Sequence, residues 1–224
     1  MHFIGHCSIN IPVMKILIST GGAKDEIADW IAEKFFDGSR VLSVGCGLGQ
    51  IEQRLWRLHG DRIELHVLDY ATEALRWLGH VMPPSRIHVV GESDSSSICY
   101  DFIYFSAVDY ALSDEKLLDL LITQRKSLQE GGAVMLLSAS FFEESKQEKL
   151  NRFVNLCKEP VKWVLERFGV YKRSAKGQLW GWLRSRNDYR TIMSAAGFVS
   201  VSDGFIETPY QRTYWIKGKG VKQV

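Results

Sequence analysis

Glycines at alternating positions form the stretch of this sequence best suited to holding a ligand. Gly45, Gly47 and Gly49 follow directly after the apolar run 41–44. Because glycine lacks a Cβ, a ligand can approach the backbone of such a turn closely. Asp69 ends the next apolar run, where a carboxylate can accept hydrogen bonds from both hydroxyls of a ribose. Together, the glycine turn and the terminal acid predict a nucleoside-binding site.

The spacing of these glycines narrows the class of ligand. A dinucleotide-binding loop has the pattern G-x-G-x-x-G and aims the next helix at a pyrophosphate, whereas residues 45–49 read G-x-G-x-G. The chain also lacks G-x-x-x-x-G-K-[ST], the loop that cradles phosphates. The pattern therefore favours a nucleoside ligand of another kind.

Strand and helix patterns alternate in a way that would position this site. The strand candidates are 41–44, 63–68, 86–90, 101–106 and 133–138. Helical patterns cover 25–36, 50–59 and 71–81, and Asp114 is expected to cap a further helix that includes Leu128. Alternation of this kind predicts parallel strands joined by crossover helices.

The pattern changes after residue 142. Residues 143–168 are helical and basic, 171–181 resemble a loop, and a helix over 188–196 precedes strand candidates at 198–202 and 212–217. These two strands are close enough in sequence to pair antiparallel at the edge of the sheet. We therefore expect an α/β fold in one domain, with a doubly wound, seven-stranded, mostly parallel sheet and a helical lid insertion after strand five. Its parts would be an N-terminal segment (1–22), a cofactor-binding core (23–140), the inserted lid (141–186), and a C-terminal helix with edge strands (187–224).

With these elements in order, residues 24–217 resemble the class I S-adenosylmethionine-dependent methyltransferases. The resemblance rests on the glycine motif, on Asp69 at the end of the second strand and on the seven-stranded sheet. It implies the Rossmann-like methyltransferase fold, with S-adenosyl-L-methionine as methyl donor and S-adenosyl-L-homocysteine as product. The family usually has an acidic residue at the position of Ser43, and this departure is expected to alter contacts to the amino group of the cofactor.

The resemblance also implies a set of cofactor-binding residues. The glycine loop would pass beneath the cofactor, Asp69 would bind its ribose and Tyr70 would flank its adenine. The segment after the third strand would meet the adenine amino group, and Ser106 would lie by the methionine part. The full set is Gly45, Cys46, Gly47, Gly49, Asp69, Tyr70, Glu92, Ser93 and Ser106.

Methyl transfer from a sulfonium mainly requires that nucleophile, methyl and sulfur be aligned and that water be excluded. The resemblance places Asp109 and Tyr110, after the fourth strand, toward the transferred methyl group as catalytic residues. The alternative is that both only cap the next helix. None of the six histidines lies beyond residue 88, so the C-terminal region offers no imidazole base. The four cysteines are scattered without a C-x-x-C pair, so we expect no metal site.

Cations and aromatic rings interleave between residues 158 and 186. Insertions at this place in the family often cover the substrate, so the resemblance implies that Tyr171, Trp180, Trp182 and Arg184 bind a flat or anionic small molecule. The same composition could stack bases and hold phosphates, so RNA methylation is the alternative. A non-catalytic binding module that keeps the fold is a third interpretation.

Composition sets the broader limits. The chain of 224 residues has 28 basic and 26 acidic residues, a net charge of +2, and 46% apolar residues, which excludes a disordered or fibrous protein.

Residues 1–142 have a net charge of −6 and residues 143–224 a net charge of +8. The near-neutral total argues against a polyanionic partner. No apolar run approaches the ~20 residues that span a bilayer. We expect a soluble, cytoplasmic protein with a small-molecule acceptor and no membrane partner; nothing indicates its oligomeric state.

Overall fold

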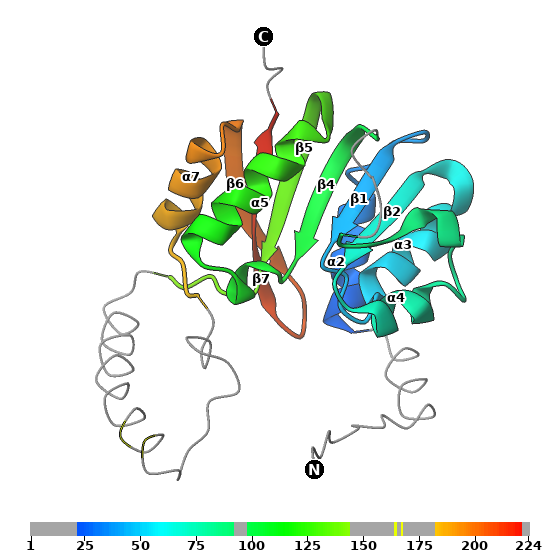
Figure 1. Ribbon diagram of the computed structural model, residues 1–224, viewed down its shortest axis with the longest axis horizontal. Coiled ribbons are helices and arrows are strands. Elements are labelled where there is room, and N and C mark those ends of the chain that lie inside the picture. Colours follow the sequence, from blue (N-terminus) through cyan, green and yellow to red (C-terminus); the bar gives the residue numbers. More distant parts are fainter. Residues whose placement is uncertain (1–21, 92–97, 144–163, 165–166, 168–181, 221–224) are drawn as a thin grey trace.

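The computed structural model describes residues 22–91, 98–143, 164, 167 and 182–220. They build a seven-stranded sheet in the order β3-β2-β1-β4-β5-β7-β6 (Figure 1). The strands are β1 (Arg40–Val44), β2 (Glu64–Asp69), β3 (Ile87–Val89), β4 (Tyr100–Ser106), β5 (Leu128–Ser138), β6 (Val199–Glu207) and β7 (Arg212–Lys219). Strands β1 to β5 pair in parallel, and β7 pairs antiparallel with both β5 and β6. The predicted mostly parallel, seven-stranded α/β fold is therefore confirmed.

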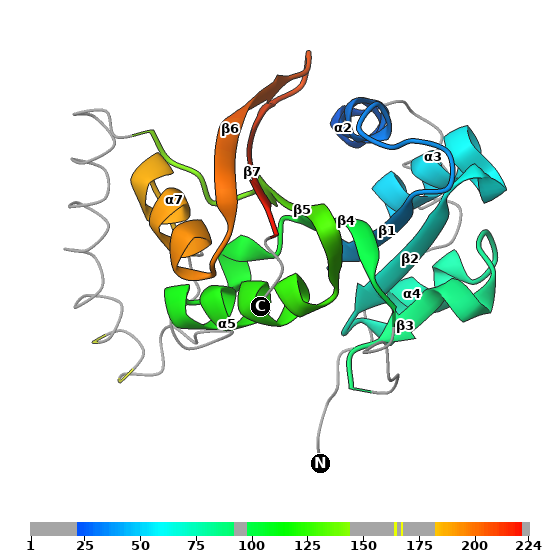
Figure 2. The same cartoon turned by 90° about the horizontal axis from the view of Figure 1, so that it is seen from above.

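Helices cover both faces of this sheet, as Figure 2 shows from above. They are α2 (Ala23–Ala32), α3 (Gln50–His59), α4 (Thr72–Leu78), α5 (Asp114–Lys126) and α7 (Arg186–Ala195). One apolar cluster joins α2, α3 and α4 to the sheet through residues such as Ile31, Leu55 and Leu78. A second cluster joins α5 and α7 to the other face through Leu121 and Ile192. Within the described ranges, no helix is both long and apolar enough to cross a bilayer.

Local sequence signals start two of these helices. Ser113, rather than Asp114 as expected, caps α5, because its side chain accepts a hydrogen bond from the Lys116 N–H. Ser185 and Asp188 form a capping box at the start of α7, in which each side chain accepts from the backbone N–H of the other residue. Both caps satisfy backbone donors that would otherwise lack a partner in the first turn.

Several boundaries differ from those expected from the sequence. Leu128 begins β5, rather than belonging to the preceding helix, because α5 ends at Lys126 and Leu128 pairs with Tyr100. Strand β6 runs past the expected end at residue 202 and reaches Glu207, because β7 pairs with it throughout that stretch. The helices expected over 25–36 and 71–81 end at residues 32 and 78, respectively.

Candidate functional site

The glycine turn lies at the point where the order of the strands reverses. The chain moves outward from β1 to β2 and β3, and then crosses to β4 on the other side of β1. Such a reversal leaves a crevice at the carboxyl ends of the parallel strands, where ligands of open α/β sheets bind. Residues 45–49 follow β1 directly and therefore border this crevice.

All three glycines of the turn have positive φ angles: 76° for Gly45, 55° for Gly47 and 68° for Gly49. A Cβ on Gly45 would lie 2.1 Å from Cγ2 of Val108, and a Cβ on Gly49 would lie 2.6 Å from Cδ2 of Leu78. A Cβ on Gly47 would meet no heavy atom within 4 Å. Packing therefore requires the outer two glycines, whereas Gly47 faces open space that a ligand can occupy.

Asp69 connects this turn to the end of β2. Its Oδ2 accepts a hydrogen bond from the Gly47 N–H at 3.0 Å and contacts the thiol of Cys46 at 3.4 Å. Its Oδ1 accepts from the Ala71 N–H at 2.9 Å. The neighbouring Tyr70 side chain is exposed. The structure thus brings together the predicted cofactor residues Gly45, Cys46, Gly47, Gly49, Asp69 and Tyr70, whose roles toward a cofactor stay predictions.

A buried polar group lies beneath the turn, and sequence reasoning missed its central residue, Glu52. Ser43 Oγ and Tyr104 OH both donate to Oε1 of Glu52, at 2.6 and 2.8 Å. All three side chains are buried, and burial raises the pKa of Glu52. The serine at the position where the family usually has an acid therefore binds a carboxyl group that α3 supplies. The helical spacing of Glu52 and the buried Leu55, three residues apart on one face, could have indicated this.

A cavity of about 380 Å³ lies beside the turn, beyond the carboxyl ends of β4 and β5 and the start of β7. Its walls include Ser106, one of the predicted cofactor residues, and Ala107, which adopts a φ of 56° that non-glycine residues rarely adopt. The charged side chains on its walls are Lys24 and Arg212. The full lining is Lys24, Ile27, Ile51, Ser106, Ala107, Leu137, Ser138, Ala139, Phe141, Gln211, Arg212, Thr213 and Tyr214.

The two wall cations differ in their partners. The Arg212 guanidinium donates to Glu207 at 2.8 Å, lies 3.8 Å from a carboxylate oxygen of Glu143 and stacks over the Phe205 ring. Lys24 forms no ion pair with any of the residues that the structure describes. The Lys24 ammonium is therefore the cation in this wall that is available to a ligand.

Asp109, which is predicted to be catalytic, lies in a buried hydrogen-bond network. Its side chain is buried, and Oδ2 accepts hydrogen bonds from Ser138 Oγ at 2.6 Å, from Ser140 Oγ at 2.7 Å and from the Tyr189 hydroxyl. Oδ1 accepts from the Ala139 N–H at 3.2 Å. These four donors join β5 and its following loop to α7, and Asp109 is not part of the cavity wall. In the described structure these bonds give Asp109 a structural role, and its catalytic role stays a prediction. Asp109 is not the cap of α5, because Ser113 has that place.

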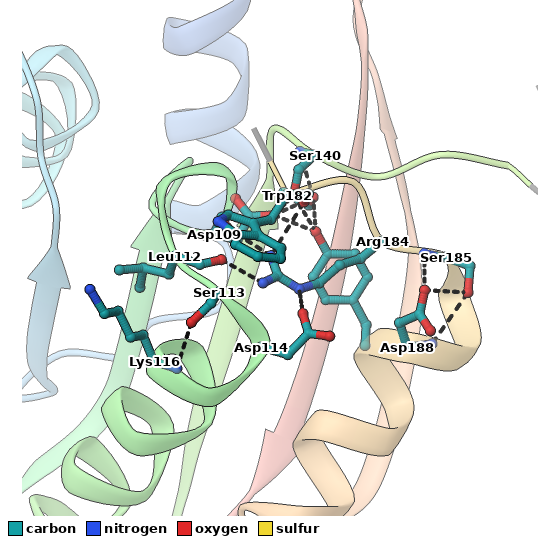
Figure 3. A network of polar contacts seen from close by, with 12 residues as sticks. Asp109, Leu112, Ser113, Asp114, Lys116, Ser140, Trp182, Arg184, Ser185 and Asp188 are labelled. Atoms are coloured by element: carbon teal, nitrogen blue, oxygen red, sulfur yellow. Dashed lines mark hydrogen bonds and ion pairs between the residues drawn. The ribbon is translucent and has the colours of Figure 1, made fainter. Parts of the chain in front are cut away.

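The Arg184 side chain is likewise held by hydrogen bonds within the protein. Figure 3 shows its buried guanidinium surrounded by the loop that follows β4. Nε donates to Asp114 at 2.8 Å, Nη1 to the Asp109 carbonyl at 2.7 Å and Nη2 to the Leu112 carbonyl at 2.6 Å. These bonds occupy the guanidinium, and Arg184 does not line the cavity, so its role in substrate binding stays a prediction. Arg186, at the start of α7, pairs with Asp203 at 3.0 Å.

The remaining predicted residues divide into two groups. Tyr110 and Trp182 are partly exposed and adjacent, since the Trp182 N–H donates to the Tyr110 carbonyl at 3.0 Å. Their roles stay predictions. Glu92, Ser93, Tyr171 and Trp180 lie outside the described residues. Within the described part of the chain, no group of three or more histidine, cysteine or acidic side chains is placed to hold a metal ion.

Comparison of the sequence with protein-family models gave no match, and comparison with curated protein sequences gave none either. Solved structures do match the fold. SibL, an S-adenosylmethionine-dependent methyltransferase solved without ligand, is 18% identical with a TM-score of 0.62, covering 89% of this chain and 55% of SibL. A Methanosarcina mazei S-adenosylmethionine-dependent methyltransferase is 15% identical with a TM-score of 0.60, covering 87% of this chain and 98% of that one.

A third match is the magnesium protoporphyrin IX methyltransferase of Synechocystis, which was solved with bound S-adenosylhomocysteine. It is 13% identical with a TM-score of 0.54, covering 96% of this chain and 90% of that one. This chain has the fold of the class I S-adenosylmethionine-dependent methyltransferases, as the glycine motif and the order of its elements predicted. It spans little more than half the length of some of these proteins, including SibL at 55% and PigF at 54%.

Proposed function

We propose that this protein is a methyltransferase that uses S-adenosyl-L-methionine to methylate an oxygen or nitrogen of a small-molecule acceptor. The observation that supports this most strongly is the contact between Asp69 and the Gly47 N–H at the reversal of the strand order. A carboxylate that could accept from ribose hydroxyls thus lies beside Gly47, where an added Cβ would meet no heavy atom of the described residues within 4 Å.

The proposal gives each part of the site a task. Asp69 would accept hydrogen bonds from the ribose, the open face of Gly47 would admit the nucleoside, and Tyr70 would flank the adenine. Ser106, which is part of the cavity wall, would lie by the methionine part. The bound cofactor would supply an electrophilic methyl group on a sulfonium. The protein would then mainly need to align the acceptor with that methyl group and exclude water.

The cavity beyond β4 and β5 suits the acceptor. One wall contains Phe141, whose ring stacks on that of Tyr214 with their centroids 4.0 Å apart. Such a surface favours a flat acceptor. We also propose that residues 141–186 cover the acceptor, with Tyr171, Trp180 and Trp182 in contact with it. In support, the described ends of this segment lie together, since the Phe142 N–H donates to the Arg184 carbonyl at 3.0 Å, and Phe141 at one end lines the cavity. No observed geometry favours RNA as the acceptor.

Calorimetric titration with S-adenosylmethionine and S-adenosylhomocysteine tests this function. We expect the protein to bind both with micromolar dissociation constants. Asp69→Asn should weaken the binding of both compounds by about 100-fold. The reason is that two hydrogen bonds to a charged acceptor each contribute roughly 1.5 kcal/mol or more to the binding free energy. The control is Asp61→Asn, which changes an exposed acid that precedes the start of β2 and should leave binding unchanged. If the folded wild-type protein bound neither compound, the non-catalytic interpretation would replace this one.

A further inference from the structure

The cavity beyond β4 and β5 has an imbalance of charge in its wall. Among the described residues that line it, Lys24 and Arg212 are charged and none is acidic. The Arg212 guanidinium donates to Glu207 at 2.8 Å and stacks over the Phe205 ring. No acid among the described residues lies within ion-pair distance of the Lys24 ammonium. Within the described structure, the wall therefore has one cation without an anionic partner.

The packing of α2 on the sheet positions Lys24 at this cavity. Ile27, three residues further along the helix, is buried and also lines the cavity. The same helix contacts β7, because the rings of Trp30 and Trp215 lie 5.5 Å apart. Thr213 lies two positions before Trp215 in β7, so its side chain is on the same face of the sheet, where it lines the cavity. The first turn of α2 and the start of β7 therefore contribute to one cavity.

The start of β7 adds neutral hydrogen-bond donors to the cavity. Gln211 Nε2 donates to Thr213 Oγ1 at 3.1 Å, and both residues line the cavity. The amide nitrogen has two N–H groups and the hydroxyl has one O–H, so this contact uses only one of these donor hydrogens. A carboxylate only accepts hydrogen bonds, and it can accept from an ammonium and from neutral donors together. The polar part of this wall is therefore suited to a carboxylate.

The rest of the wall suits an apolar body. Ile27, Ile51 and Leu137 line the cavity. Cavities that bind small molecules are typically apolar, with a few polar groups that fix the orientation of the ligand. Neither the glycine turn 45–49 nor Asp69 is part of this wall, so the proposed nucleoside site and the cavity are separate parts of the crevice. The cation at Lys24 is therefore assigned to the part proposed for the acceptor.

We infer that the methyl acceptor is a flat acid whose carboxylate binds the Lys24 ammonium, with Gln211 and Thr213 as further donors. The inference rests on the proposed function and names the class of its substrate. The pair formed by the ammonium and the carboxylate is charge-assisted, which makes it stronger than a contact between neutral groups. The sulfonium of a bound methyl donor would add to the attraction, because it is a second positive charge near the same ligand.

The test measures by calorimetry how matched acids and amides bind to the protein loaded with S-adenosylhomocysteine. The probe pairs are para-hydroxybenzoate with para-hydroxybenzamide, para-aminobenzoate with para-aminobenzamide, and a hydroxynaphthoate with its amide. The members of each pair have nearly the same shape and differ in charge. We expect at least one acid to bind about tenfold more tightly than its amide. Lys24→Met should bring the two affinities to within about twofold of each other, whereas Lys24→Arg, which keeps the charge, should retain a preference of about threefold or more.

The matched control is Lys116→Met, because Lys116 is an exposed lysine of α5, a helix that packs on the opposite face of the sheet. This variant should keep the preference of the wild type for the acid. Lys24→Met and Lys116→Met should both bind S-adenosylhomocysteine within about twofold of the wild type. If Lys24→Met weakened that binding about tenfold, the ammonium would hold the carboxylate of the cofactor instead, and the inference would be overturned.

Two further results would overturn the inference while leaving the proposed function intact. One is that no acid of the panel binds the loaded wild-type protein more tightly than its amide. The other is that a preference for the acid survives Lys24→Met. If the folded wild-type protein bound neither S-adenosylmethionine nor S-adenosylhomocysteine, the proposed function itself would fail.

Discussion

Replacing Asp109 with alanine is expected to lower the free energy of unfolding by about 3 kcal/mol, because it removes the shared acceptor of a buried network. Three hydroxyls and one backbone N–H converge on this carboxylate from β5, from the loop that follows it and from α7. The hydroxyl oxygens of Ser138 and Tyr189 lie 2.5 Å apart and can still form a hydrogen bond with each other, which limits the loss of stability. Urea denaturation followed by circular dichroism measures the effect.

The matched control for this change is Asp114→Asn. Asp114 lies in the same network through Arg184 Nε, but its side chain is 64% exposed, so we expect a loss of less than about 1 kcal/mol. An Asp109→Ala protein that was as stable as the wild type and still bound S-adenosylmethionine, but no longer transferred methyl groups, would contradict the structural role. It would restore Asp109 as a catalytic residue.

The Gly45→Ala variant is expected to lose about 3 kcal/mol of stability, and with it the binding of S-adenosylmethionine. Two costs add at this position. The φ of 76° is unfavourable for alanine, and the new methyl group would lie 2.1 Å from Val108 Cγ2. Either the turn after β1 or the loop after β4 must shift, and both border the site. Thermal unfolding and calorimetric titration measure the two losses.

Variants at two other glycines distinguish the cost of the positive φ from the cost of the steric clash. Gly38 has a φ of 87° and no heavy atom within 4 Å of its Cβ position, so Gly38→Ala should lose about 1 kcal/mol and bind normally. Gly47→Ala should lose a similar amount of stability. It should also weaken the binding of S-adenosylmethionine at least tenfold, because its methyl group would occupy the space proposed for the ligand. Normal binding by Gly47→Ala would show that the ligand does not approach this backbone.

The residues named above are expected to divide into those that affect ligand binding and those that affect stability. Changes at Gly47 and Asp69 are expected to act on binding, whereas changes at Asp109 and Arg184 are expected to act on stability. The structure explains this division, because Asp69 borders the open space next to Gly47 while the Arg184 guanidinium is buried among carbonyl and carboxylate oxygens.

Local patterns determined much of the fold. The run 41–44, the glycines after it and the helix over 50–59 are all visible in the sequence, because a buried strand needs a short apolar run and an amphipathic helix needs apolar residues three or four positions apart. The helix over 50–59 has the expected bounds. The position of Asp69 at the end of β2 also follows from such a pattern, whereas its hydrogen bond from the Gly47 N–H is seen only in the structure.

Only the tertiary structure decided what the polar residues outside these patterns do. Asp109 and Tyr189 are 80 positions apart, and Arg184 and Leu112 are 72 apart, so no local spacing connects them. A carboxylate that follows a strand can point toward a ligand or into the protein. Its direction depends on the conformation of the loop, in which Ala107 has a φ of 56°, and on which distant hydrogen-bond donors pack against it. Glu52 shows the same limit: its helix was predictable, but its contact with Ser43 and Tyr104 required the packing of α3 against β1 and β4. The periodicity of a sequence predicts which face of a helix or strand is buried. The hydrogen-bond partners of a side chain depend instead on how elements far apart in the chain pack against each other.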